Sequence, residues 1–93
     1  MLDIKVFGKK ECSKCAATKR KLEFFVEQSG NESLKINFID LDSIDGLTEA
    51  CMKDATDIPT TVIEKDGREV IRWTKKVPES SDIEELQKIM AET

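Results

Sequence analysis

Cys12 and Cys15, separated by Ser13 and Lys14, are the residues of this chain best suited to chemistry. Their spacing is used for thiol-disulfide exchange and also for binding soft metal ions such as copper or zinc. The sequence contains no histidine, which excludes mixed cysteine-histidine zinc sites and cysteine-histidine nucleophilic catalysis. Because there are three cysteines in all, a four-thiolate metal site would need a second subunit.

The elements around the cysteines favour redox chemistry. Ile4, Val6 and Phe7 form a short apolar stretch that ends at Gly8, which predicts a buried strand followed by a turn. A helix is expected from Ser13, so Cys12 lies where the strand gives way to the helix. Free backbone N–H groups and the positive end of the helix dipole stabilise a thiolate at such a place. We therefore expect Cys12 to be the nucleophile.

The helix that starts at Ser13 is amphipathic and should end before Gly30-Asn31. Its predicted inner side carries Cys15, Thr18, Leu22, Phe25 and Val26. Cys15 is therefore expected to be more buried and less reactive than Cys12. This position suits a resolving thiol, which would close a Cys12–Cys15 disulfide after Cys12 has attacked a substrate.

A basic segment surrounds the cysteine pair. Residues 9–21 contain six lysines and arginines and one acid, a formal charge of +5 in a chain whose net charge is −4. No aromatic residues are interleaved with these charges and the chain is acidic overall, so nucleic-acid binding is not expected. Lys9, Lys10 and Lys14 lie nearest the sulfurs, where they would support the thiolate, and Lys9 and Lys14 are expected to contact a substrate. These charges favour an acidic partner surface.

The remaining elements follow from periodicity and turn residues. Alternating apolar residues predict a strand over 34–41, and a short helix should follow, capped by Asp42, Ser43 or Asp45. The predicted buried stripe of this helix consists of Leu47, Ala50, Cys51 and Ala55. Cys51 is therefore expected in the core.

The C-terminal half predicts a hairpin and a helix. Segments 60–63 and 69–73 are rich in branched and aromatic residues and flank Asp66-Gly67, a strong hairpin signal. Ser81 and Glu84 predict a capping box that opens the last helix. The expected order is βαβαββα: an α/β fold with a four-stranded mixed sheet flanked by three helices.

Length and composition set broad bounds. With 93 residues, 39% of them hydrophobic, one domain spanning residues 1–93 is expected. No stretch approaches the roughly 20 apolar residues that cross a bilayer, and the start lacks the order of a signal peptide. We expect a cytoplasmic monomer with no membrane contact, and an odd cysteine count argues against a disulfide scaffold.

The run from Val6 to Cys15, followed by the segment Asp57-Ile58-Pro59-Thr60-Thr61-Val62, resembles the thioredoxin and glutaredoxin superfamily. The resemblance spans nearly the whole chain and implies the thioredoxin-like fold. It also implies that Pro59 is cis and faces the cysteines, and that Ile58, with Pro59 and Thr60, contacts a substrate chain. Lys9 matches the lysine that many glutaredoxins carry three residues before the first cysteine.

The implied activity is reduction of protein disulfides through a Cys12/Cys15 cycle, with an upstream reductase as second partner. No cofactor beyond this redox-active disulfide is implied. Glutaredoxins usually have a Gly-Gly pair after the hairpin, whereas this chain reads Val70 to Thr74, which argues against glutathione as the favoured partner. Short redoxins that resemble glutaredoxins in length and thioredoxins in partner use are the closest match.

Two departures from thioredoxins concern the site itself. Ser13-Lys14 differs from both the Gly-Pro of thioredoxins and the Pro-Tyr of glutaredoxins. Val6 stands where thioredoxins have a buried aspartate that assists proton transfer, so another carboxylate such as Asp57, or solvent, would have to serve.

Two other classes of protein remain open. A soft-metal carrier would bind copper or zinc through the cysteine pair, although small copper chaperones generally have a methionine where this chain has Lys10. In the other alternative, the fold is a redox-inert binding module.

Overall fold

The computed structural model describes residues 2–92. The elements are β1 (Leu2–Gly8), α1 (Ser13–Ser29), β2 (Leu34–Asp40), α2 (Ile44–Met52), β3 (Thr60–Lys65), β4 (Arg68–Thr74) and α3 (Ser80–Ala91). This confirms the predicted βαβαββα order. The ends of α1 and of the hairpin also fall where the sequence placed them: Gly30 follows α1 in a left-handed conformation, and Asp66-Gly67 joins β3 to β4.

The strands form one mixed sheet in the order β2-β1-β3-β4. β1 runs parallel to β2 and antiparallel to β3, and β3 and β4 are an antiparallel hairpin. β1 is therefore an inner strand, hydrogen-bonded on both sides. Because α1 connects two neighbouring parallel strands, its N-terminus is held at the carboxyl end of β1.

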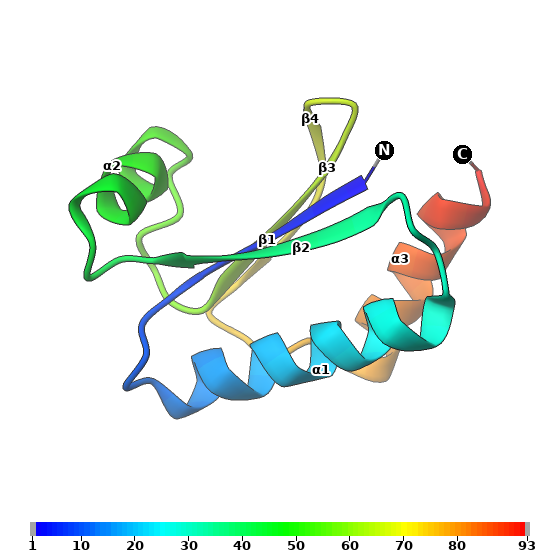
Figure 1. Ribbon diagram of the computed structural model, residues 1–93, viewed down its shortest axis with the longest axis horizontal. Coiled ribbons are helices and arrows are strands. Elements are labelled where there is room, and N and C mark those ends of the chain that lie inside the picture. The colour runs from blue at the N-terminus through cyan, green and yellow to red at the C-terminus, as the bar shows by residue number, and fades with distance from the viewer. Residues whose placement is uncertain (1, 93) are drawn as a thin grey trace.

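Helices cover both faces of the sheet. Figure 1 shows α1 and α3 below it and α2 above it. The larger core lies between the sheet and the two helices α1 and α3, and it contains Leu2, Ile4, Val6, Leu22, Leu34, Ile63, Ile71, Trp73 and Leu86. The smaller core lies between the sheet and α2, and it contains Phe7, Leu41, Ala50, Ala55 and Val62. The successive residues Val6 and Phe7 of β1 enter opposite cores, because neighbouring side chains of a strand point to opposite faces.

The orientation of α2 differs from the prediction. Gly46 and Ala50 are its buried residues, whereas Cys51 is exposed and Leu47 is 47% exposed. The predicted core position of Cys51 is therefore wrong. α2 begins so close to β2 that a Cβ on Gly46 would overlap the carbonyl oxygen of Asp40. This close approach requires the smallest residues of the helix to face the sheet and turns Leu47 and Cys51 outward.

The start of α3 also differs. The helix begins at Ser80 with Glu79 as N-cap, and the carboxylate of Asp82 accepts a hydrogen bond from the backbone N–H of Glu79 at 2.8 Å. The predicted capping box of Ser81 and Glu84 is therefore placed two residues too late. Asp82 is also held by Lys76 at 2.9 Å, which the helical periodicity does not reveal.

No helix among residues 2–92 is both long and apolar enough to cross a membrane.

Candidate functional site

Cys12 is the N-cap of α1. Its backbone is extended, with φ −108° and ψ 115°, and its carbonyl accepts the first helical hydrogen bond, from the N–H of Ala16 at 3.0 Å. The Cys12 Sγ accepts a hydrogen bond from the backbone N–H of Cys15 at 3.2 Å. The sulfur therefore occupies the place of a capping oxygen, where the unpaired N–H groups of the helix converge.

The two sulfurs have opposite environments. Cys12 is half-buried, whereas Cys15 is fully buried on the inner side of α1 with Thr18 and Leu22. Both are free thiols in this structure. The reactive sulfur of a dithiol pair needs access to its partner, and of the two only Cys12 has it.

Hydrogen bonding lowers the pKa of Cys12 below the ordinary value of 9.0. The largest cause is the hydrogen bond from the Cys15 side chain, and the backbone N–H groups of Cys15 and Lys14 and the charge of Lys14 act in the same direction. Burial raises the pKa of Cys15 to about 11, and its position as donor to Cys12 adds to this. Of the pair, Cys12 therefore ionises first while Cys15 keeps its proton.

Gly8 lies directly against Cys15. A Cβ on Gly8 would be 2.7 Å from the Cys15 Sγ and 2.9 Å from its Cβ, well inside ordinary contact. The same Cβ would be 3.4 Å from Phe38 on β2. Only a residue without a side chain lets α1 bring Cys15 this close to the sheet, so the glycine at the end of β1 sets the depth of the second sulfur.

The Ile58–Pro59 bond is cis, as the resemblance implied. Thr60 is paired with Phe7 in the sheet, so Ile58 and Pro59 continue alongside Gly8 and the carboxyl end of β1. The carbonyl of Pro59 accepts from the N–H of Lys75 at 2.8 Å. Thr60 is fully buried and its hydroxyl donates to the carbonyl of Asp57. Within residues 2–92, no hydrogen bond occupies the backbone of Ile58.

The predicted lysines lie at the surface of this site. Lys9 and Lys14 are exposed, and the Lys9 ammonium is 3.7 Å from a carboxylate oxygen of Asp42. Beneath the site, Val6 is fully buried and paired with Phe38 on β2 and Thr61 on β3. The position at which thioredoxins have a buried aspartate is therefore occupied by an apolar side chain, between Phe38 and the hydroxyl-bearing Thr61.

No group of three or more cysteine, aspartate or glutamate side chains is arranged to hold a metal ion in the described part of the chain. A metal ion at Cys12 and Cys15 would therefore depend on these two sulfurs or on ligands from another molecule.

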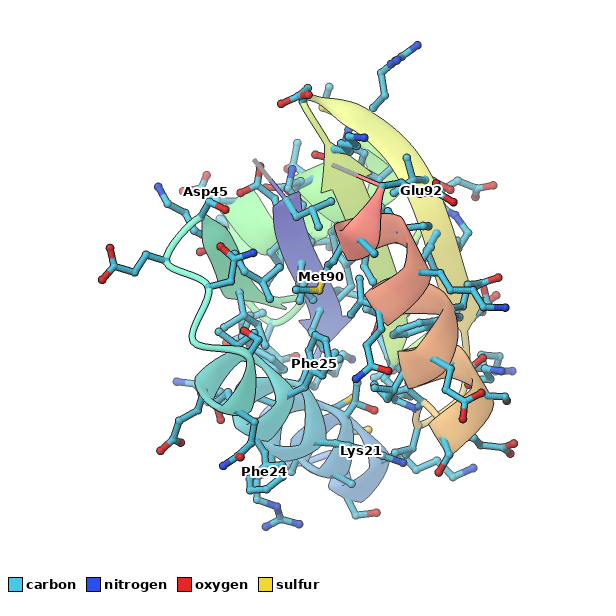
Figure 2. All side chains as sticks on the ribbon, turned by 90° about the vertical axis from the view of Figure 1, so that its right-hand side faces the viewer. Lys21, Phe24, Phe25, Asp45, Met90 and Glu92 are labelled. Carbon is cyan, nitrogen blue, oxygen red and sulfur yellow. The ribbon has the colours of Figure 1, made fainter. Side chains whose placement is uncertain are left out.

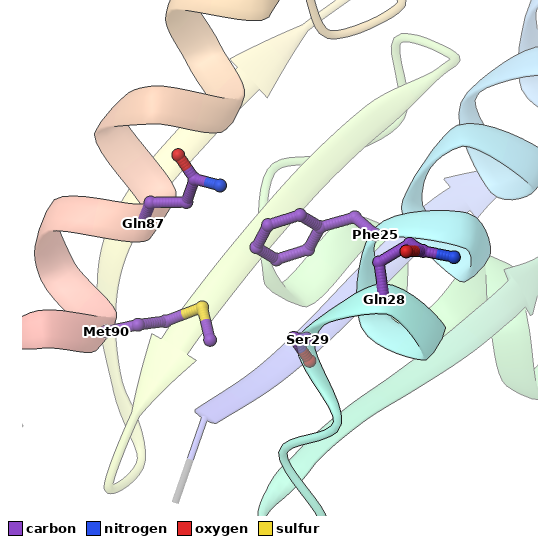
Figure 3. Close-up of a pocket in the computed structure, with 5 residues that line it drawn as sticks. All are labelled: Phe25, Gln28, Ser29, Gln87 and Met90. Atoms are coloured by element: carbon purple, nitrogen blue, oxygen red, sulfur yellow. The ribbon is translucent and has the colours of Figure 1, made fainter.

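The hollows of the described structure are not confined to the cysteine site. A groove of about 410 Å³ lies between α1 and α3, lined by residues such as Phe24, Phe25 and Ile83. Figure 2 shows the two helices side by side with Phe25 and Met90 between them. In Figure 3 the Phe25 ring points from α1 toward α3. Phe25 is ten residues along α1 from Cys15, roughly 15 Å at the helical rise, so this groove is separate from the thiol site.

Solved structures resemble this chain over nearly its whole length. Thioredoxin 1 from Thermosipho africanus superposes with a TM-score of 0.80 at 21% identity, covering 96% of this chain and 94% of that one. The thioredoxin of Fasciola hepatica gives 0.74 at 22% identity, covering 99% and 81%. The oxidised thioredoxin of Plasmodium falciparum gives 0.65 at 25% identity, covering 97% and 81%.

The chain has the thioredoxin fold. This confirms the fold predicted from the cysteine motif and the proline segment. Neither a family model nor a curated protein matches the sequence.

Gly8 and Phe38 are the parts of this thioredoxin-fold site that the sequence did not reveal. The sequence indicates Gly8 only as the end of a strand, and Phe38 as one apolar residue of a strand pattern. A glycine that ends an inner strand four residues before the first cysteine was the available signal for a close contact. Phe38 carries none, because its position beside Gly8 depends on the pairing of β1 with β2.

Proposed function

We propose that the protein is a thiol-disulfide oxidoreductase that reduces protein disulfides through Cys12 and Cys15. The observation that supports this most is the arrangement of the two sulfurs. The sulfur at the N-terminus of α1 accepts hydrogen bonds and has a lowered pKa, while the buried sulfur beside it has a raised pKa. An attacking thiol and a resolving thiol need these two environments.

In the first step, the Cys12 thiolate attacks one sulfur of the substrate disulfide. The substrate S–S bond breaks, a mixed disulfide forms at Cys12, and the other substrate sulfur leaves as a thiolate. We propose that the backbone of Ile58 holds the substrate chain beside Pro59 during this step, since no internal hydrogen bond within residues 2–92 occupies that backbone. Thr60 keeps the segment in place, and Lys9 and Lys14 contact the substrate at the rim.

In the second step, Cys15 attacks Cys12. Once the Cys12 sulfur is in the mixed disulfide it carries no charge, so one cause of the raised pKa of Cys15 is removed. The Cys15 proton goes to the substrate thiolate released in the first step. The Cys15 thiolate then displaces the second substrate thiolate and forms the Cys12–Cys15 disulfide. The substrate gains two electrons, which an upstream reductase has to return to this protein.

The experiment that tests this function is turnover of a protein disulfide, with insulin as substrate and dithiothreitol as donor. Wild type, Cys12→Ser, Cys15→Ser and the matched control Cys51→Ser are compared, and bound copper and zinc are assayed on the same samples. The proposal predicts turnover in wild type and Cys51→Ser, loss in the other two, and a trapped mixed disulfide in Cys15→Ser. Stoichiometric metal without turnover would identify a metal carrier, and neither metal nor turnover would identify a redox-inert module.

A further inference from the structure

A second hollow, of about 210 Å³, adjoins the cysteine site. It is lined by Lys9, Lys10, Ala16, Lys19 and Phe38. Lys10 precedes Cys12 by two residues and Ala16 follows Cys15 directly. The Phe38 ring reaches to within 3.4 Å of the position of a Cβ on Gly8, the residue that contacts Cys15. The hollow therefore lies beside the turn and the first helical turn that carry the two cysteines.

The charges around this hollow are unbalanced. Lys9 has a carboxylate partner at 3.7 Å, the exposed Asp42. Lys10 makes no ion pair with the described residues, and the ammonium of Lys19 lies over the Phe38 ring, 5.4 Å from its centre. Within residues 2–92, neither Lys10 nor Lys19 is paired with an acid. Three like charges close together favour an incoming anion, because it lowers their mutual repulsion.

The floor of the hollow selects among anions. Phe38 is half-buried and Ala16 lies beside it, so the base is apolar while the rim is cationic. A glutamate or aspartate side chain fits this pattern, with methylene groups over the ring and the carboxylate among the lysines. A long polyanion fits less well, because residues outside 9–21 carry a formal charge of −9 and would repel its remainder.

We propose that this lysine pocket, formed by Lys9, Lys10, Lys19, Ala16 and Phe38, binds an acidic side chain of the substrate protein close to the disulfide that Cys12 attacks. The inference rests on the proposed reductase function and names its substrate class: disulfide proteins with an acidic segment beside the reactive cysteine. The pocket raises the rate of capture of such substrates, and salt weakens it because its charges are exposed.

Two disulfide peptides that differ only in glutamate against glutamine beside the cysteine test the proposal. Wild type should have a kcat/KM about threefold to tenfold higher for the acidic peptide at low salt. The ratio should fall toward one in Lys10→Gln/Lys19→Gln and at high salt. Lys19→Gln alone should also lower the ratio, and Arg20→Gln is its matched control, because each removes one positive charge from α1 and Arg20 does not line the pocket. The ratio in Arg20→Gln should stay at the wild-type value.

Equal rates for the two peptides in wild type, or an equal loss of the ratio in Arg20→Gln, would overturn the pocket and leave the reductase function intact. If neither peptide is reduced, the proposed function itself fails.

Binding without chemistry gives an independent readout. A short cysteine-free polyglutamate peptide should shift the amide resonances of Lys10, Ala16, Lys19 and Phe38 in an NMR titration, and the double variant should abolish these shifts. Inorganic phosphate serves as a second probe. Shifts with phosphate but not with the peptide, or no shifts at all, would refute an acidic side chain as the occupant.

Discussion

Replacing Gly8 with alanine places a methyl group where the structure already has the Cys15 side chain. The new Cβ would lie 2.7 Å from Cys15 Sγ and 2.9 Å from Cys15 Cβ, whereas carbon atoms in good contact are about 3.5–4.0 Å apart. The sulfur must therefore move by roughly 1 Å or more, or α1 must lift from the sheet. Either movement disturbs the hydrogen bond between the Cys15 N–H and Cys12 Sγ or the depth of Cys15.

The expected cost is that of overpacking a dense core. Forcing an extra methyl group into such a site reduces the free energy of unfolding by about 1–3 kcal/mol. In a domain of this size each kcal/mol lowers Tm by roughly 4–8 °C. The pKa of Cys12 should also rise toward its ordinary value. The hydrogen bond from the Cys15 side chain is the largest cause of its lowering, and the sulfur that makes this bond has to move.

The assay is a double-mutant cycle on the reduced protein. Gly8→Ala, Cys15→Ala and the double variant are unfolded in urea, and the alkylation rate of Cys12 is followed against pH in wild type and Gly8→Ala. Because Cys15→Ala removes the sulfur but keeps the Cβ contact at 2.9 Å, the cost of Gly8→Ala should be smaller in that background without vanishing. A Gly8→Ala variant as stable as wild type, or one whose cost is the same in both backgrounds, would refute the close packing of Gly8 against Cys15.

Three further predictions follow from the charges and exposures. Iodoacetamide should alkylate Cys12 with an apparent pKa below 9.0 and Cys15 with one near 11. Alkylation followed by mass spectrometry over a pH series measures both values, and a higher pKa for Cys12 than for Cys15 would contradict the prediction. Burial opposes ionisation of Glu64, but hydrogen bonds from Lys53 and Lys5 outweigh burial and lower the pKa of Glu64. Ionised Glu64 therefore stabilises the folded protein above about pH 4.3, and this contribution is lost as the pH falls through the folded-state pKa. Glu64→Gln should cost about 1–3 kcal/mol at pH 7, and urea unfolding should show the difference from wild type shrinking as the pH falls below about 4.3. Exposed Cys51 should react fully with a maleimide in the folded protein, and Cys51→Ser should change the free energy of unfolding by less than about 0.5 kcal/mol; slow labelling would place Cys51 in the core after all.

The sequence by itself determined which elements form and in what order. The alternation in β1, the periodicity of α1 and the Asp66-Gly67 turn are patterns within a few neighbouring residues, and local backbone preferences are enough to read them. The position of Cys12 just before the first turn of α1 also follows from neighbouring residues alone. The sequence therefore predicts that Cys12 is the more exposed sulfur and Cys15 the more buried one.

The tertiary structure alone decided how the elements meet. The side of α2 that faces the sheet depends on its distance from β2, and this distance placed Gly46 inward and Cys51 outward. Phe38 reaches the cysteine site through the register of β1 with β2, and Lys19 reaches Phe38 through the packing of α1 over that pair. Contacts between residues far apart in the chain depend on how closely whole elements approach, and no local pattern of residue types records that separation.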